Sequence, residues 1–136
     1  MKTVFADTGY WVAILNPDDG LHQVSVSVTA TLSALRIITS EMVLTEVLNS
    51  FSKQGAFLRQ NAVMLIQRSM RQSNVEIVPQ TSELFHEALQ LYTQRPDQAW
   101  SLTDCASFCI MQQRNILEAL THDRHFEQAG FIALLR

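Results

Sequence analysis

Short apolar segments alternate with helix-like segments along the whole chain. The strand-like segments cover residues 4–6, 36–39, 75–78, 117–120 and 131–134. The helix-like segments cover residues 10–15, 22–35, 41–53, 57–71, 82–94, 102–114 and 123–128. This alternation is typical of βαβ units, in which parallel strands are joined by helical crossovers. It therefore predicts an α/β fold with a mostly parallel sheet that helices cover on both faces.

Length and composition limit the kinds of protein this chain can be. Its 136 residues predict one domain, spanning residues 1–136. The apolar run in residues 1–7 is too short for a signal peptide, and no apolar run is long enough to cross a bilayer. We therefore expect a soluble, cytoplasmic protein without a membrane partner. The formal net charge of −3 is not that of a protein that binds nucleic acid by charge alone.

Four acidic residues occupy positions that point to one edge of the predicted sheet. Asp7 and Asp123 follow strands and begin helices, and Asp104 stands near the start of the helix at 102–114. Glu46 lies one to two turns into the helix after the second strand. Because ligands of open α/β sheets bind beyond the carboxyl ends of the strands, these side chains can face a common site.

Each of these acids also has an ordinary structural interpretation. Asp7 and Asp123 match helix N-caps, Ser101 to Asp104 matches a capping box, and Glu46 can be a solvated helix residue. However, Glu46 and Asp104 stand in apolar surroundings, where an unpaired carboxylate is costly to bury. Clustered carboxylates repel one another and call for a cation, and hard oxygen ligands favour Mg²⁺ or Mn²⁺. The spacing thus predicts a metal site.

Several short motifs, which occur in a fixed order, make this hypothesis more specific. They are Asp-Thr at residues 7–8, Glu-Val-Leu-Asn at 46–49, Ser-Leu-Thr-Asp at 101–104, Asp-Arg-His-Phe at 123–126, and the tail at 126–131. In this order and at these separations, the motifs resemble those of PIN-domain proteins of the VapC toxin type. The resemblance covers the whole chain, and no acidic position of the pattern is missing.

The resemblance implies a three-layer fold whose five-stranded parallel sheet has the order 3-2-1-4-5. It implies an RNA endonuclease that depends on Mg²⁺ or Mn²⁺ and acts as the toxin of a type II toxin–antitoxin system. Such proteins are often homodimers and are held in check by a cognate antitoxin. Asp7 and Asp104 are then expected as the main metal ligands, and Glu46 and Asp123 as ligands that bind directly or through water.

Four neighbouring polar residues are candidates to orient these carboxylates: Thr8, Asn49, Thr103 and Thr121. A local cap or backbone hydrogen bond is an equally good interpretation of each. The aromatic residues Tyr10, Trp11 and Trp100 can stack on an unpaired base or pack in the core. The apolar stripe from Phe57 to Met70 can face a partner or the protein's own core.

Two other functions remain open from the sequence. The chain can be a catalytically inactive PIN-fold module that keeps the pocket for stability or docking. It can also be a related metal-dependent phosphodiesterase that acts on DNA. A phosphoryl-acceptor domain is disfavoured, because the only lysines are Lys2 and Lys53 and neither follows a later strand.

Overall fold

The computed structural model describes residues 2–31 and 34–136. The strands are β1 (Thr3–Ala6), β2 (Arg36–Ser40), β3 (Val75–Val78), β4 (Glu118–Leu120) and β5 (Ile132–Ala133). The helices are α1 (Thr8–Leu15), α2 (His22–Thr31), α3 (Glu41–Ser50), α4 (Ala56–Arg71), α5 (Ser82–Gln94), α6 (Leu102–Gln113) and α7 (Arg124–Gln128).

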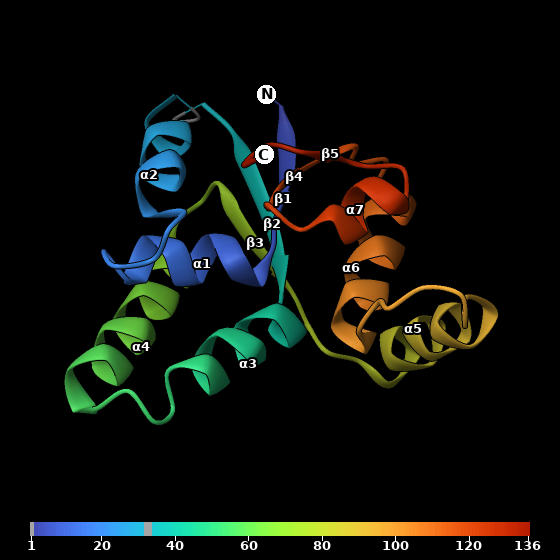
Figure 1. Cartoon of the computed structure of the whole chain (residues 1–136), viewed down its shortest axis with the longest axis horizontal. Coiled ribbons are helices and arrows are strands. Elements are labelled where there is room, and N and C mark those ends of the chain that lie inside the picture. The colour runs from blue at the N-terminus through green and yellow to red at the C-terminus, as the bar shows by residue number, and fades with distance from the viewer. Residues whose placement is uncertain (1, 32–33) are drawn as a thin grey trace.

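All five strands form one parallel sheet in the order β3-β2-β1-β4-β5, which confirms the predicted topology. Helices α1 to α4 lie on one side of this sheet and α5 to α7 on the other (Figure 1). The chain leaves β1 toward β2 but leaves β4 toward β5, so its path diverges between the two central strands. This divergence opens the crevice at which α/β sheets bind ligands.

The core lies where the central strands meet the helices on both sides. Val4, Phe5 and Ala6 of β1 are fully buried, as expected for a parallel strand covered on both faces. Beyond β4, the rings of Trp100, Phe108 and Phe126 pack edge to face, with centroid distances of 5.0 Å and 4.9 Å to Phe108. These aromatic contacts join α6 and α7 to the loop before α6.

Some predicted boundaries were wrong. The helix predicted over 22–35 ends at Thr31; residues 32 and 33 lie outside the described part of the chain, and residues 34 and 35 are not helical. The β-branched residues of this segment are weak helix formers. The helix predicted over 41–53 ends at Ser50, and buried Phe51 closes a turn by donating its N–H to the Leu48 carbonyl at 3.2 Å.

The C-terminal elements are shorter than predicted. The strand predicted over 131–134 contains only Ile132 and Ala133, which pair with Glu118 and Ala119 of β4. Helix α7 begins at Arg124, with Asp123 as its N-cap. It ends at Gln128, with Ala129 as its C-cap; Gly130 follows with a φ of 96°, which suits glycine, and the Phe131 N–H donates to the Phe126 carbonyl at 2.9 Å.

Among the described residues, we find no helix with the length and apolarity needed to span a membrane. The longest helix is α4, which has 16 residues and carries several arginines.

Replacement of a core phenylalanine should destabilise the protein far more than replacement of a surface one. The side chain of Phe5 is 0% exposed, whereas that of Phe57 is 74% exposed. We expect Phe5→Ala to lower the free energy of unfolding by about 3–5 kcal/mol, and Phe57→Ala to change it by no more than about 0.5 kcal/mol. Urea denaturation measures both. Equal losses would contradict this description of the core.

Candidate active site

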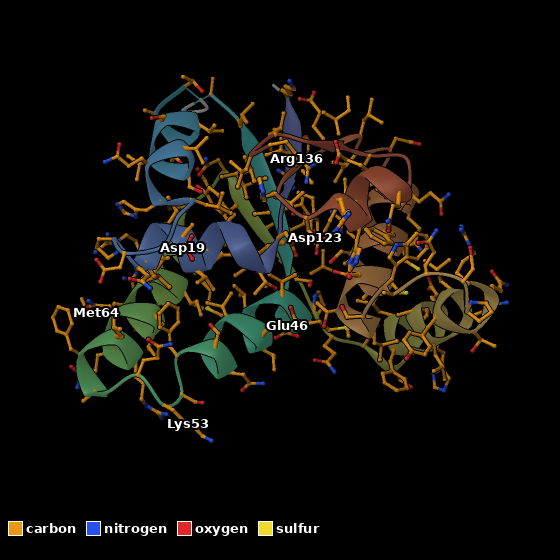
Figure 2. The ribbon with its side chains drawn as sticks, viewed as in Figure 1. Asp19, Glu46, Lys53, Met64, Asp123 and Arg136 are labelled. Carbon is orange, nitrogen blue, oxygen red and sulfur yellow. The ribbon has the colours of Figure 1, made fainter. Side chains whose placement is uncertain are left out.

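Four carboxylates from four separate segments of the chain line one cavity of about 490 Å³. Asp7 follows β1, Glu46 lies in α3, Asp104 lies in the first turn of α6, and Asp123 precedes α7. Figure 2 shows Glu46 and Asp123 near the middle of the molecule, on segments from opposite sides of the sheet. The cavity, hereafter the acidic cavity, therefore lies at the crevice that the diverging chain path creates.

Thr121 joins the ends of the two central strands. Its hydroxyl donates to Asp7 Oδ2 at 3.0 Å and accepts a hydrogen bond from the Asp123 backbone N–H at 3.0 Å. The Asp7 backbone N–H donates to the Leu120 carbonyl at 3.2 Å, which continues the pairing of β1 with β4. One threonine thus fixes two of the four acidic segments relative to each other.

Asp104 and Asp123 are held as the caps that the sequence indicated. Asp104 completes a capping box with Ser101, in which the Ser101 backbone N–H donates to Asp104 Oδ2 at 3.1 Å. Asp123 Oδ1 accepts from the His125 backbone N–H at 2.9 Å. The structural interpretation is therefore correct for both residues, and it also explains how their carboxylates are directed into the acidic cavity.

Thr8 orients Glu46 across the cavity. The Thr8 hydroxyl, at the start of α1, donates to Glu46 Oε1 at 2.7 Å. Helix α3 follows β2 without a connecting loop, since Ser40 ends the strand and caps the helix through Val43 N–H at 3.1 Å. This direct junction places Glu46 above the edge of the sheet.

Burial and mutual repulsion make the acidic cavity unfavourable for charged carboxylates. Burial raises the pKa of Asp7 to about 7, and the negative charges of Asp104 and Asp123 act in the same direction. Hydrogen bonds from Thr8 and Thr121 oppose that rise. Burial also raises the pKa of Asp104, with a smaller contribution from Asp123, against hydrogen bonds from Ser101 and His125. A bound cation would favour the ionised form of both groups.

The geometry of three side chains suits a metal ion. Asp104, Asp123 and His125 each offer a ligand atom, and these atoms all lie within 4.8 Å of one another. The hydrogen bonds to Asp104, Asp123 and Glu46 all reach a single oxygen of each carboxylate. Among the described residues, none donates to the second oxygen of these three groups. Those oxygens are the hard donors that Mg²⁺ and Mn²⁺ prefer.

The candidate orienting residues differ in where they lie. Thr8 and Thr121 line the acidic cavity and bond to its carboxylates. Asn49 does not: it lies beside Glu46 on α3 but lines a separate groove with residues of α4. The Thr103 side chain is absent from the cavity lining, and its backbone carbonyl accepts from Ser107. A helix turns by about 100° per residue, so side chains three positions apart point about 60° away from each other around the axis. This difference is enough for Glu46 to face the acidic cavity while Asn49 faces the groove.

From the sequence, His125 lies next to the site with a structural role favoured over a contact with phosphate, and it was not among the predicted ligands. Its Nδ1 lies 3.0 Å from Asp104 Oδ2 and 3.4 Å from Asp123 Oδ1. Its position two residues after Asp123 was a signal, but the contact with Asp104 spans 21 residues and exists only in the folded chain. Of the two interpretations of Tyr10, Trp11 and Trp100, base stacking and packing in the core, their burial supports packing.

Comparison with family models decides the family. The PIN domain model matches residues 4–132. The chain belongs to the PIN domain family. A curated relative from Mycobacterium tuberculosis, the 23S rRNA-specific endonuclease VapC20, is 26% identical to this PIN domain over 129 residues, which covers 95% of each chain.

Solved structures show the same fold. The crystal structure of M. tuberculosis VapC20, described as a Sarcin-Ricin loop cleaving toxin, has a TM-score of 0.82 and 25% identity, and covers 95% of this chain and 96% of that one. The crystal structure of FitAcB from Neisseria gonorrhoeae has a TM-score of 0.65 and 15% identity, and covers 96% of this chain and 94% of that one. The resemblance to VapC-type PIN domains is thus confirmed along nearly the full chain.

The raised pKa of Asp7 links the stability of the metal-free PIN domain to pH. In the unfolded chain this carboxyl ionises near 3.8, whereas in the folded protein it keeps its proton up to about pH 7. Between these values the folded state binds more protons than the unfolded state. The contribution of Asp7 to the free energy of unfolding therefore falls as pH rises from about 4 to 7.

We expect Asp7→Asn to stabilise the metal-free protein at pH 8 but not at pH 4. The gain at pH 8 should reach up to about 4 kcal/mol, because one pKa unit corresponds to about 1.4 kcal/mol. Urea denaturation in EDTA at pH 4, 6 and 8 measures it. Asp18→Asn, in an exposed turn, is the control and should show no such pH dependence. A gain that is constant with pH would argue against a buried, protonated Asp7.

Proposed function

We propose that this chain is a divalent-metal-dependent endoribonuclease that hydrolyses RNA phosphodiester bonds. The observation that carries the proposal is the meeting of Asp7, Glu46, Asp104 and Asp123 in one cavity at the carboxyl edge of the sheet. Membership of the PIN family and similarity to the rRNA endonuclease VapC20 over 95% of both chains support the same reaction class.

The acidic residues would hold the metal in the acidic cavity. Asp7 and Asp104 are proposed as the main ligands, with Glu46 and Asp123 binding directly or through water. When bound, Mg²⁺ or Mn²⁺ supplies an activated water, shields the phosphate charge and assists the departing oxygen. Thr8, Thr121 and His125 keep the carboxylates oriented through the hydrogen bonds described above.

A basic surface accompanies the acidic cavity, although the whole chain is negative. Residues 47–75 contain Lys53, Arg59, Arg68 and Arg71 and no aspartate or glutamate. None of these four cations forms an ion pair with any residue that the structure describes. Figure 2 shows Lys53 at the outer end of the arm formed by α3 and α4, whereas Glu46 lies at its inner end. This arm can attract RNA phosphates toward the site.

Removing one proposed ligand should abolish cleavage without unfolding the protein. We expect Asp104→Asn to lower the rate of RNA cleavage in Mg²⁺ or Mn²⁺ by at least about 100-fold, since loss of supporting residues alone commonly costs 10–100-fold. EDTA should stop the wild-type reaction. Asparagine can still accept the Ser101 hydrogen bond, so circular dichroism should be unchanged. The matched control, Asp18→Asn, should cleave like the wild type.

The outcomes separate the proposal from its two alternatives. Cleavage that survives in Asp104→Asn indicates a contaminating nuclease and removes the support for this site. An inactive wild-type protein that binds Mn²⁺ indicates a non-catalytic PIN module. Faster cleavage of DNA than of RNA of the same sequence indicates a phosphodiesterase that acts on DNA.

We further propose that the chain is the toxin of a type II toxin–antitoxin pair and forms a homodimer. The similarity to VapC20, which is described as a toxin, supports this role. The groove between α3 and α4, of about 600 Å³, offers a surface for an antitoxin, since its lining includes exposed Leu48, Val63 and Met64. Arg59 in the same groove favours an acidic partner segment.

Expression in a bacterial host tests the toxin role. We expect the wild-type chain to arrest growth and Asp104→Asn to be tolerated at the same protein level, because the arrest requires RNA cleavage. Co-expression of a small DNA-binding protein encoded next to this gene should restore growth. Normal growth of cells that contain active wild-type enzyme would contradict the toxin role and would indicate a ribonuclease with a different function. Light scattering of the purified protein decides whether it is a dimer.

A further inference from the structure

A second hollow of about 560 Å³ opens beside the acidic cavity. It lies where the end of α5, the loop 95–101 and the start of α6 meet, and we call it the α5–α6 hollow. Its lining consists of Leu89, Tyr92, Gln98, Ala99, Trp100, Ser101 and Leu102. Ala99 and Ser101 also line the acidic cavity, so the two spaces adjoin. A ligand whose phosphate enters one can place its neighbouring group in the other.

The α5–α6 hollow exposes a flat aromatic surface. The side chain of Tyr92 is 52% exposed, and that of Leu89, one turn earlier on the same helix, is 42% exposed. The Tyr92 hydroxyl makes no hydrogen bond with any residue in the described part of the chain. An exposed tyrosine ring offers a π-face on which any nucleobase can stack.

A polar side chain stands in the same hollow without a partner. The Gln98 side-chain amide accepts and donates no hydrogen bond within residues 2–31 and 34–136, and the residue is partly buried. A primary amide presents an acceptor and two donors in one plane. The edge of a nucleobase carries the same kinds of group, and paired hydrogen bonds from glutamine to a base are a known means of recognition.

Trp100, which lines the hollow, is held by several contacts. Trp100 is only 6% exposed, its ring packs edge-on against Phe108, and its Nε1 donates to Gln128 Oε1 at 3.1 Å. The Arg95 guanidinium lies 4.9 Å from the centre of the Trp100 ring. These contacts explain why Trp100 supports the hollow rather than stacking on a ligand itself, and they keep its shape before a ligand arrives.

We infer that the α5–α6 hollow binds an unpaired nucleobase of the RNA next to the phosphate that is cleaved, with Tyr92 stacking on the base and Gln98 bonding to its edge. This inference rests on the proposed ribonuclease function, because it takes the acidic cavity as the place of the phosphate. Unlike the acidic cavity, the hollow has no carboxylate among the described residues that line it, so this lining does not repel an RNA strand. The inference makes Tyr92 and Gln98 determinants of the specificity for RNA.

Kinetics on a single-stranded RNA with one mapped cleavage site test the inference. We expect Tyr92→Ala to raise KM by about ten- to one-hundred-fold, the usual effect of losing one stacked base, with little change in kcat. Tyr92→Phe should behave like the wild type, since the ring is kept. Gln98→Ala should weaken the preference for particular bases at the cleavage site. Phe85→Ala and Gln90→Ala, exposed α5 residues outside the hollow, are the matched controls.

A binding experiment supplies a readout that does not require cleavage. Fluorescence anisotropy with the Asp104→Asn protein compares the mapped RNA with the same RNA lacking the base beside the cleaved phosphate. Removing the base and replacing Tyr92 with alanine should each weaken binding by a similar factor. Made together, the two changes should weaken it no further, because both remove the same contact.

Each outcome bears on a different part of the argument. A wild-type protein that cuts no RNA overturns the proposed function itself. If the wild-type protein cuts RNA but Tyr92→Ala has the same KM and kcat as Phe85→Ala, only the nucleobase subsite is overturned. If removal of the base and Tyr92→Ala weaken binding additively when combined, the nucleobase subsite is also overturned. A Tyr92→Ala variant that loses self-association but binds RNA normally would instead make the hollow a protein interface.

Discussion

The burial of several carboxylates in one cavity, together with their mutual repulsion, is the constraint on which the other features of this molecule depend. Burial raises the pKa values of Asp7 and Asp104, the negative charges of Asp104 and Asp123 add to the rise at Asp7, and that of Asp123 adds to the rise at Asp104. An isolated domain gains nothing in stability from such an arrangement. It becomes favourable only with a cation or a proton in the cavity, which is why the stability of the fold and the chemistry of the site are linked.

The fold supports this unfavourable cluster with hydrogen bonds that come from nearby backbone and hydroxyl groups. Thr121 bonds to Asp7 and to the backbone of Asp123, Thr8 bonds to Glu46, and Ser101 caps the helix of Asp104. These bonds fix one oxygen of the Asp7, Glu46 and Asp104 carboxylates and direct the groups inward, and the His125 backbone N–H does the same for Asp123. The parallel sheet makes this possible, because the ends of β1 and β4 lie side by side at the point where the chain path diverges.

The two sides of the sheet contribute different parts of the proposed active site. Helix α3 carries Glu46, and residues 47–75 beyond it contain four cations and no acids. On the other side, α5 to α7 carry Asp104, His125 and the hollow beside the cavity. The lining of the acidic cavity combines residues from both sides, and Figure 2 shows Glu46 and Asp123 on segments from the two sides. A substrate that spans the crevice can therefore meet positive charge on one side and an aromatic, uncharged surface on the other.

The sequence by itself determined the α/β class, most element positions and the four acidic residues, because hydrophobic periodicity and capping patterns act over a few residues and are visible in the chain. The strand order was available only through the family resemblance. Tertiary structure alone decided which residues share the cavity. It joined His125 to Asp104, turned Asn49 onto another groove, buried Trp100 and left Tyr92 exposed beside the site. These outcomes depend on which helix face meets which neighbour, and that is set by packing between segments far apart along the chain.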